Sequence, residues 1–188
     1  MTISVVDLSS DDSFDSLADQ SFTVTTADND IAGFTITETN GSTEVDESGD
    51  TDIFTVVLDA QPANDVVLSI ISSDTGEATV TSTLTFTSAN WDTAQTVTVT
   101  GVDDSLLDGS QSSIVTISVV DQNTSDEFDA VADQTVSVST TDDDVAGFTI
   151  VELDGSTEVD ESGDTDTFTV VLDAQPDSNV VVAISVSD

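Results

Sequence analysis

The sequence predicts an all-β fold of antiparallel, immunoglobulin-like sandwiches, and three observations point to it. Short apolar runs rich in Thr, Val, Ser and Ile alternate with turn residues, as expected of strands that bury one face. No segment keeps a helical period over about ten residues. The chain also repeats itself at an offset of 114 residues, which is the length of one β-sandwich domain.

The repeat defines the expected domain organisation. Residues 2–74 align with residues 116–188 without a gap, and 48 of these 73 positions are identical. We therefore expect residues 31–144 to form one complete sandwich. Residues 1–30 are then the C-terminal strands of a preceding repeat, and residues 145–188 are the N-terminal strands of the next, truncated one.

Seven runs within the complete repeat carry the strand pattern. They are residues 32–38, 52–58, 66–72, 79–87, 96–102, 113–120 and 134–140. If every connection reverses the chain, an odd number of strands brings it in at one end of the sandwich and out at the other. Tandem sandwiches are therefore expected to join end to end with almost no linker. A closed barrel is the alternative, and the uneven connections make it less favoured.

The charge of the chain excludes several classes of function. It has 39 acidic residues, no Lys, Arg or His, and no Cys, so its formal net charge is −39. Binding to nucleic acid needs cationic side chains, and nucleophilic catalysis by a lysine or thiol needs residues that are absent. No apolar stretch reaches 18 residues and no signal peptide is recognised, so membrane insertion is not expected. The charged groups available as metal ligands are carboxylates, which suit Ca²⁺ or Mg²⁺.

The same strand alternation places four acidic groups at the end where the chain leaves the sandwich. They are Glu44, Asp46, Glu47 and Asp50; Asp74 and Glu77; Asp103, Asp104 and Asp108; and Asp142, Asp143 and Asp144. Carboxylates gathered without basic partners repel one another, and a bound Ca²⁺ would relieve this repulsion. The alternative interpretation is a solvated acidic rim without an ion.

Three motifs carry a family resemblance. Val45-Asp46-Glu47 follows the first strand, Val99 to Asp104 ends a strand in paired aspartates, and Asp142-Asp143-Asp144 leads into Ala146-Gly147-Phe148. In this combination the complete repeat resembles the Calx-β family, the calcium-binding sandwich of sodium–calcium exchangers that also recurs in bacterial surface proteins. Residues 84–99 are in addition similar to the extender domains of large bacterial surface adhesins.

The resemblance implies a set of calcium ligands. They are Glu47, Asp103, Asp104, Asp108, Asp142, Asp143 and Asp144, with the backbone carbonyl of Leu106 as an addition. Asp74 of the converging acids, Asp28 and Asp30 of the first linker, and Glu161, the repeat equivalent of Glu47, are further candidates. The number of ions and their affinity stay open, because Asp74-Thr75-Gly76-Glu77 stands where the family has an aspartate–tyrosine pair.

Enzymatic motifs are weaker than these. Asp74-Thr75-Gly76 spells the aspartic-protease signature, but the mechanism needs two such carboxylates sharing a proton and the rest of the complete repeat holds no second copy. A glycosidase cleft normally offers aromatic side chains for stacking, whereas this chain has one Trp and no Tyr. We therefore expect that the protein is not an enzyme.

The function expected from the sequence is mechanical. We expect a calcium-stabilised spacer, or extender, repeat of a large secreted or cell-surface protein, such as an adhesin or biofilm protein. Its partners would be neighbouring repeats of the same chain. The alternative is a self-assembling extracellular filament or matrix subunit in which strands pair between copies. A third possibility, adhesion to sugar, would need an aromatic groove that the sequence does not indicate.

Overall fold

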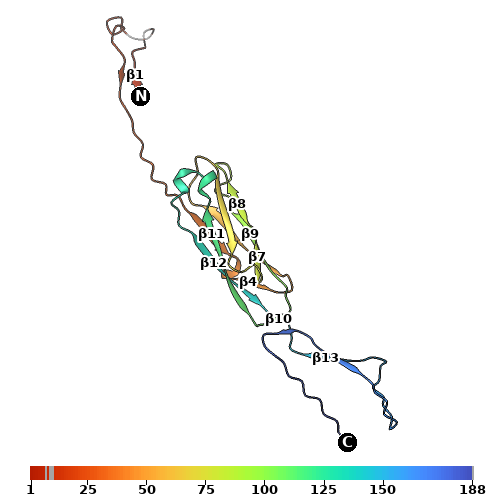
Figure 1. Ribbon diagram of the computed structural model, residues 1–188. Coiled ribbons are helices and arrows are strands. Elements are labelled where there is room, and N and C mark those ends of the chain that lie inside the picture. Colours follow the sequence, from red (N-terminus) through yellow and green to blue (C-terminus); the bar gives the residue numbers. More distant parts are fainter. Residues whose placement is uncertain (7, 9–10, 188) are drawn as a thin grey trace. The chain divides into compact units, whose positions relative to one another are not determined.

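The computed structural model describes residues 1–6, 8 and 11–187, so Asp188 of the expected last repeat lies outside the described residues. The chain forms two compact units, residues 1–31 and residues 32–188. In the first unit, β1 (Thr2–Ile3) pairs with β2 (Gln20–Ser21) in antiparallel orientation. The second unit contains the sandwich and the strands that follow it (Figure 1).

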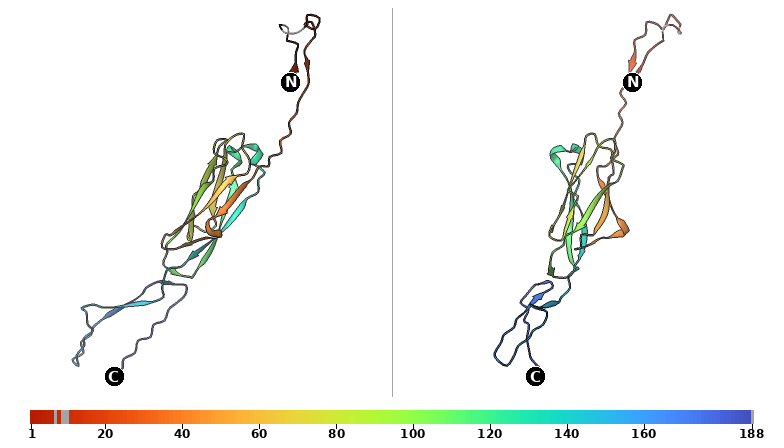
Figure 2. Two further views of the ribbon diagram at one scale, coloured as in Figure 1. Left: turned by 180° about the vertical axis from the view of Figure 1, so that it is seen from behind. Right: turned by 90° about the vertical axis from the view of Figure 1, so that its right-hand side faces the viewer.

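The sandwich consists of nine strands in two sheets within the described residues (Figure 2). The first sheet has the order β3 (Phe34–Glu38), β5 (Thr51–Leu58), β9 (Gln95–Gly101) and β7 (Ala78–Val80). The second has the order β4 (Thr43–Asp46), β12 (Gln134–Thr141), β11 (Gln111–Val119), β6 (Val66–Ser72) and β8 (Thr83–Phe86). The predicted all-β class is confirmed, and each of the seven predicted runs overlaps a strand.

Further short elements complete the second unit. Three 3-10 turns are described in it, η2 (Thr39–Gly41), η3 (Asp121–Asn123) and η4 (Asp126–Phe128). The remaining strands are β10 (Leu106–Leu107), β13 (Phe148–Glu152), β14 (Phe168–Leu172) and β15 (Gln175–Pro176). The pair β13 and β14 is antiparallel, whereas β10 and β15 pair in parallel.

The sandwich differs from the predicted strand order in two places, because β4 lies outside every predicted run and one predicted run divides between the sheets. After β3 the chain turns at Asn40 and Gly41, whose φ angles are 60° and 86°, and continues as β4 in the other sheet. The expectation that Glu44 and Asp46 lie in a connection is therefore wrong. β4 also runs parallel to β12, so the sandwich is not wholly antiparallel. The predicted run at 79–87 divides into β7 in the first sheet and β8 in the second.

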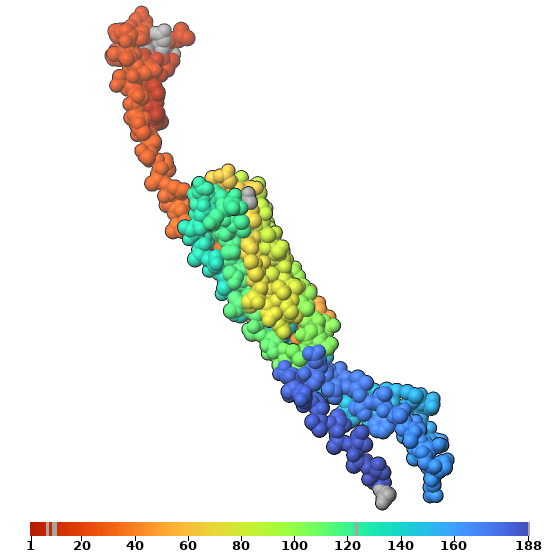
Figure 3. All heavy atoms as spheres, viewed as in Figure 1, coloured from red at the N-terminus to blue at the C-terminus, as the bar shows by residue number. Residues whose placement is uncertain are grey.

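The hydrophobic core lies between the two sheets and follows the two-residue period of the strands. In β5, Phe54, Val56 and Leu58 point inward and are at most 3 % exposed. Across the ladder Phe54 lies opposite Val97 of β9, and both side chains are fully buried. Burial of each such side chain stabilises the fold by about 1.5–3 kcal/mol. The space-filling view shows the strands of the sandwich side by side on one continuous outer face (Figure 3).

Strand registers recur at the sequence offset of 114 residues. Phe34 pairs with Leu58 in the complete sandwich, and Phe148 pairs with Leu172 after it. Thr35 donates a hydrogen bond to Asp59 over 2.7 Å, and its equivalent Thr149 donates one to Asp173 over 2.8 Å. Identical stretches of sequence thus form the same local structure twice.

The repeat provides a matched test of the core. Phe54→Ala should lower the free energy of unfolding by about 3–5 kcal/mol, because it removes a fully buried side chain and leaves a cavity. Its equivalent Phe168 is 38 % exposed, so Phe168→Ala should cost about 1 kcal/mol or less. Urea unfolding monitored by circular dichroism measures both. Equal losses in the two variants would contradict the assigned core.

Candidate metal centre

Four segments far apart in sequence meet at one end of the sandwich, which we call the acidic end. Its segments are residues 46–50, residues 74–77, residues 103–109 and residues 142–144. Backbone hydrogen bonds hold them together: the Glu47 N–H donates to Thr141 over 3.1 Å, and the Val102 N–H donates to Glu77 over 2.9 Å. The convergence predicted from strand alternation is therefore observed for segments of all four acidic groups.

Gly101 makes the close approach of these segments possible. It is the last residue of β9, it is buried, and a Cβ at this position would overlap the backbone carbonyl of Asp46. Only a glycine lets the end of β4 lie directly on β9. Gly101 thereby positions Glu47, which follows Asp46, against the segment that begins at Asp103.

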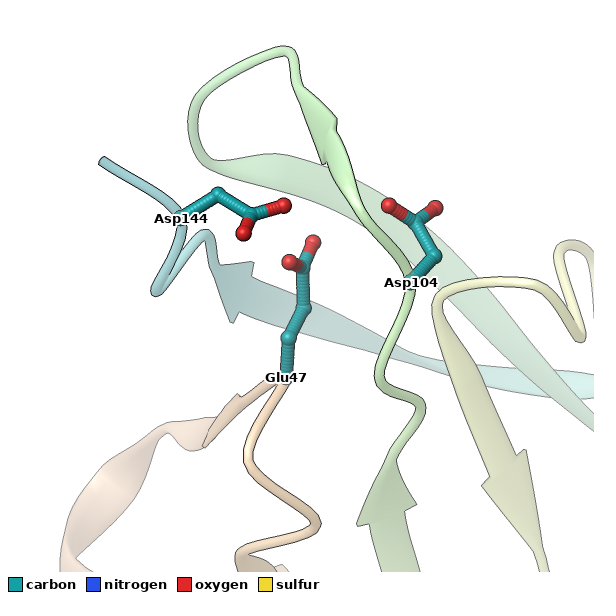
Figure 4. Close-up of side chains that lie close together, drawn as sticks. All are labelled: Glu47, Asp104 and Asp144. Carbon is teal, nitrogen blue, oxygen red and sulfur yellow. The ribbon is translucent and has the colours of Figure 1, made fainter. Parts of the chain in front are cut away.

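Three carboxylates at the acidic end lie within reach of one ion. One oxygen from each of Glu47, Asp104 and Asp144 can be chosen so that all three lie within 4.8 Å of one another. The three side chains come from the segments after β4, β9 and β12, and the Asp144 and Glu47 carboxylates face each other (Figure 4). Glu47 is 1 % exposed, Asp144 is half-buried and Asp104 is exposed.

The acidic end contains buried oxygens that the described residues leave without a hydrogen-bond partner. They are Glu47 Oε2, Glu77 Oε2, Asp108 Oδ1 and Asp144 Oδ2. One comes from each of the four converging segments. Burying an unpaired carboxylate oxygen is costly, so four such atoms at one end of a sandwich favour the binding of a cation there.

Burial and mutual repulsion raise the pKa values of these groups. Burial, followed by the charges of Asp104 and Asp142, raises the pKa of Glu47 from 4.5 to about 7. Burial also raises the pKa of Glu77, with Asp108 as its strongest repelling neighbour, and it raises the pKa of Asp144. The sequence contains no Lys, Arg or His that could compensate these charges.

The donor set fits a hard divalent cation. Ca²⁺ takes six to eight oxygen ligands and tolerates irregular geometry, whereas Mg²⁺ demands a near-ideal octahedron and gives up its water reluctantly. Carboxylates from four separate segments, in a chain without His or Cys, match the preference of Ca²⁺. Glu47, Asp104 and Asp144 are the residues best placed to hold it.

Other predicted ligands lie at the acidic end with different environments. Asp142 accepts a hydrogen bond from the Gly109 N–H over 2.7 Å, and Asp108 is half-buried. Asp103 and Asp143 are exposed, and their charges contribute to the raised pKa of Asp144. These four residues stay predicted ligands or neighbours of the ion.

Asp74 and Leu106 have local hydrogen-bonding roles. Asp74 is exposed and accepts a hydrogen bond from the Gly76 N–H over 2.9 Å, which closes the turn before β7. The Leu106 N–H donates to Asp104 Oδ1 over 2.6 Å, so this residue steadies a candidate ligand. Ligation by Asp74 or by the Leu106 carbonyl stays a prediction.

The candidates outside the complete sandwich are exposed. Asp28 and Asp30 belong to the first unit, where Asp28 accepts a hydrogen bond from the Asp30 N–H over 3.0 Å. Glu161 lies in the segment after β13 and is exposed, in contrast to its buried equivalent Glu47. Their roles as ligands stay predictions.

Glu77 is a residue that the predicted ligand set omitted. Its Oε2 is among the buried unpaired oxygens, and its pKa rises with that of Glu47. The signal available in the sequence was its position just before a predicted strand. In the structure the next residue, Ala78, begins β7 and is fully buried. A carboxylate at the edge of a buried strand is poorly placed to reach solvent.

Comparison with known proteins gives distant structural likenesses. No protein-family model matches the chain, and no curated protein matches its sequence. Among solved structures, it is similar to the apo-form Calx CBD1 domain, with 14 % identity, a TM-score of 0.42, and coverage of 59 % of this chain and 98 % of that one.

Two further structures are similar to a comparable degree. The surface layer protein SbsC, domains 1–6, has 16 % identity and a TM-score of 0.43 over 83 % of this chain and 24 % of that one. The E. coli chaperone DraB has 6 % identity and a TM-score of 0.43 over 63 % of this chain, which spans 59 % of the chaperone's length. These values mark a remote likeness and assign no ligand to this chain.

The raised pKa of Glu47 predicts how the calcium-free protein responds to pH. Because the folded state holds the Glu47 proton more tightly than the unfolded state, the contribution of Glu47 to stability is fully present below pH 4.5 and is lost as the pH rises to about 7. Glu47→Gln removes this titration and should reduce the loss. Glu161→Gln, the repeat equivalent, should not. Urea unfolding in chelator between pH 5 and pH 8 gives the slopes, and equal slopes for parent and Glu47→Gln would contradict this assignment.

Proposed function

We propose that this chain is part of a calcium-stabilised structural spacer, in which Ca²⁺ bound at the acidic end of a sandwich holds together the loops that lead to the next repeat. The observation that carries the proposal is the set of four buried, unpaired carboxylate oxygens within the described residues, one from each converging segment. In a chain without basic side chains, a metal ion is the charge that can compensate them.

The position of the site supports a mechanical role. Asp142, Asp143 and Asp144 follow β12 directly, and β13 of the next repeat begins at Phe148. An ion shared by Asp144 and Glu47 would tie the connecting segment to the sandwich it leaves. That tie would restrict motion between successive repeats.

The expected affinity is that of extracellular calcium modules, on the order of 10⁻⁴–10⁻³ M. At a hundredfold excess of Ca²⁺ over the dissociation constant, one site adds about 2.7 kcal/mol to the free energy of unfolding. This is a large fraction of the stability of a domain of this size. An extracellular setting, where calcium is abundant, is therefore part of the proposal, as is membership of a large surface or secreted protein such as an adhesin or biofilm protein.

A purely structural role is also proposed over catalysis. The charged side chains of the acidic end are all carboxylates, and the chain has no imidazole or basic side chain to act beside them in acid–base catalysis. Within the described residues, no helix is long and apolar enough to cross a membrane.

One observation favours a second candidate function, a self-assembling filament or matrix subunit. Phe148, Ile150 and Phe168 occupy positions equivalent to buried or half-buried residues of the complete sandwich, yet they are 38–55 % exposed. Apolar strand faces of this kind can pair with another copy. Light scattering distinguishes the two functions, since a spacer stays monomeric in Ca²⁺ and a filament subunit grows.

Calcium should raise the melting temperature. We expect an increase on the order of 10 °C between excess chelator and 10 mM Ca²⁺ at equal ionic strength, because 10 mM is a hundredfold excess over a dissociation constant of about 10⁻⁴ M and adds about 2.7 kcal/mol. Scanning calorimetry measures it, and Mg²⁺ at the same concentration serves as the control for non-specific screening, with a smaller shift expected. An unchanged melting temperature in Ca²⁺ would refute the proposed function.

We expect two substitutions, Asp104→Asn and Glu47→Gln, each to weaken Ca²⁺ binding by at least tenfold. Each removes a charged ligand from the group of three carboxylates that Asp144 completes. In chelator the Glu47→Gln variant should be more stable than the parent at pH 8, since it relieves buried repulsion. Glu161→Gln is the matched control and should keep the affinity of the parent. Isothermal titration calorimetry decides the matter: parental affinity in both variants would place the ion elsewhere.

A further inference from the structure

A short backbone pairing connects the complete sandwich to the repeat that follows it. Strand β10 pairs in parallel with β15, placing Leu106 opposite Gln175 and Leu107 opposite Pro176. The Gln175 N–H donates to the Ser105 carbonyl over 2.6 Å. These two segments are separated by the whole of β11 to β14, so the pairing is a long-range contact (Figure 1).

An apolar contact accompanies the pairing. Leu107 lines one cavity together with Ala146, Phe148, Leu172, Pro176 and Val180. Leu106 and Leu107 are both half-buried, although they stand between Asp104 and Asp108 in one of the most acidic stretches of the chain. Two adjacent leucines at such a position gain free energy only if an apolar partner removes them from water.

The leucine pair is held at both ends by acidic-end residues. The Leu106 N–H donates to Asp104, and after the pair the Gly109 N–H donates to Asp142 over 2.7 Å. Gly109 has a φ of 75° and turns the chain back into β11. The segment 104–109 is therefore fixed at its base and presents Leu106 and Leu107 at its tip.

We propose that Leu106 and Leu107 form a docking element that captures the Gln175-Pro176 segment of the following repeat. The sandwich thereby holds its neighbour by strand pairing and an apolar contact, in addition to the covalent connection. This docking goes beyond the calcium site proposed above, because the strand pairing is made by backbone groups and the cavity is lined by apolar side chains.

The repeated sequence extends the proposal to successive copies. Asp59-Ala60-Gln61-Pro62 in the complete sandwich is identical to Asp173-Ala174-Gln175-Pro176, so each repeat carries the same acceptor segment. In the complete sandwich Phe34, Leu58 and Val66, the equivalents of three cavity residues, are at most 3 % exposed. In the complete sandwich Ala60 and Pro62 are buried as well, whereas Gln61 is exposed. Between complete repeats the docking therefore rests on the glutamine of the acceptor segment and its backbone rather than on the apolar contact.

The absence of cysteine from the chain permits a direct test of the joint. Spin labels at Thr83→Cys in β8 and Thr169→Cys in β14, both exposed, report the distance between the sandwich and the following repeat. In Ca²⁺ buffer the full chain should give a narrow distance distribution by pulsed electron paramagnetic resonance. Adding Leu107→Gln should at least double its width, and the same substitution at the exposed Leu153 should leave it unchanged.

A second variant addresses the backbone pairing. Gln175→Pro removes the N–H that donates to Ser105 and should broaden the distribution without altering the sandwich. The fluorescence of Trp91, the one Trp of the chain, verifies that the sandwich remains folded. Distributions as narrow in both variants as in the parent would overturn the docking proposal. Calcium titration of the same parent protein tests the metal site separately. Failure of the docking proposal is therefore distinguishable from failure of the calcium proposal.

Discussion

The constraint on which the rest of the structure depends is the convergence of carboxylates that have no basic partner. Strand alternation brings four acidic segments to one end of the sandwich, and Gly101, where a Cβ would overlap the backbone of Asp46, lets them approach closely. Burial then raises the pKa of Glu47 to about 7, and its acidic neighbours add to the effect. Coulombic repulsion at this end opposes the free energy gained from the core. A bound divalent cation would replace that repulsion with attraction between the cation and the carboxylates.

The architecture separates stability from sensitivity to ions. The core around Phe54, Val97 and Phe86 is apolar and fully buried, so it does not depend on ionisation. The acidic end contains the carboxylates that repel one another, and the connection to the next repeat begins there at Asp142. A change in calcium concentration would therefore act first on the junction between repeats and only then on the sandwich as a whole. That behaviour suits a spacer whose stiffness depends on its surroundings.

Much of this could be predicted from the sequence, because the relevant signals are periodic. The two-residue alternation located the strands, and the offset of 114 residues indicated the repeat. Strand parity alone placed Glu47, Asp104 and Asp144 at the same end. What parity could not reveal was the crossing of the chain between sheets at Asn40 and Gly41, since the segment that follows the first run, and contains β4, looks like an ordinary connection.

The finer arrangement of the site also depended on packing. The sequence places Glu77 among the converging acids, but its partial burial and the effect of the Asp108 charge on its pKa depend on packing that local spacing does not encode. The pairing of Leu106 and Leu107 with Gln175 and Pro176 joins segments of unlike sequence, so the repeat pattern gave no hint of it.

The most direct test of the central claim is the anomalous diffraction of a crystal grown in Ca²⁺. The account predicts an anomalous peak within about 2.3–2.6 Å of carboxylate oxygens from Glu47, Asp104 and Asp144. A calcium-soaked crystal with no peak there, and with these side chains turned out into solvent, would contradict it.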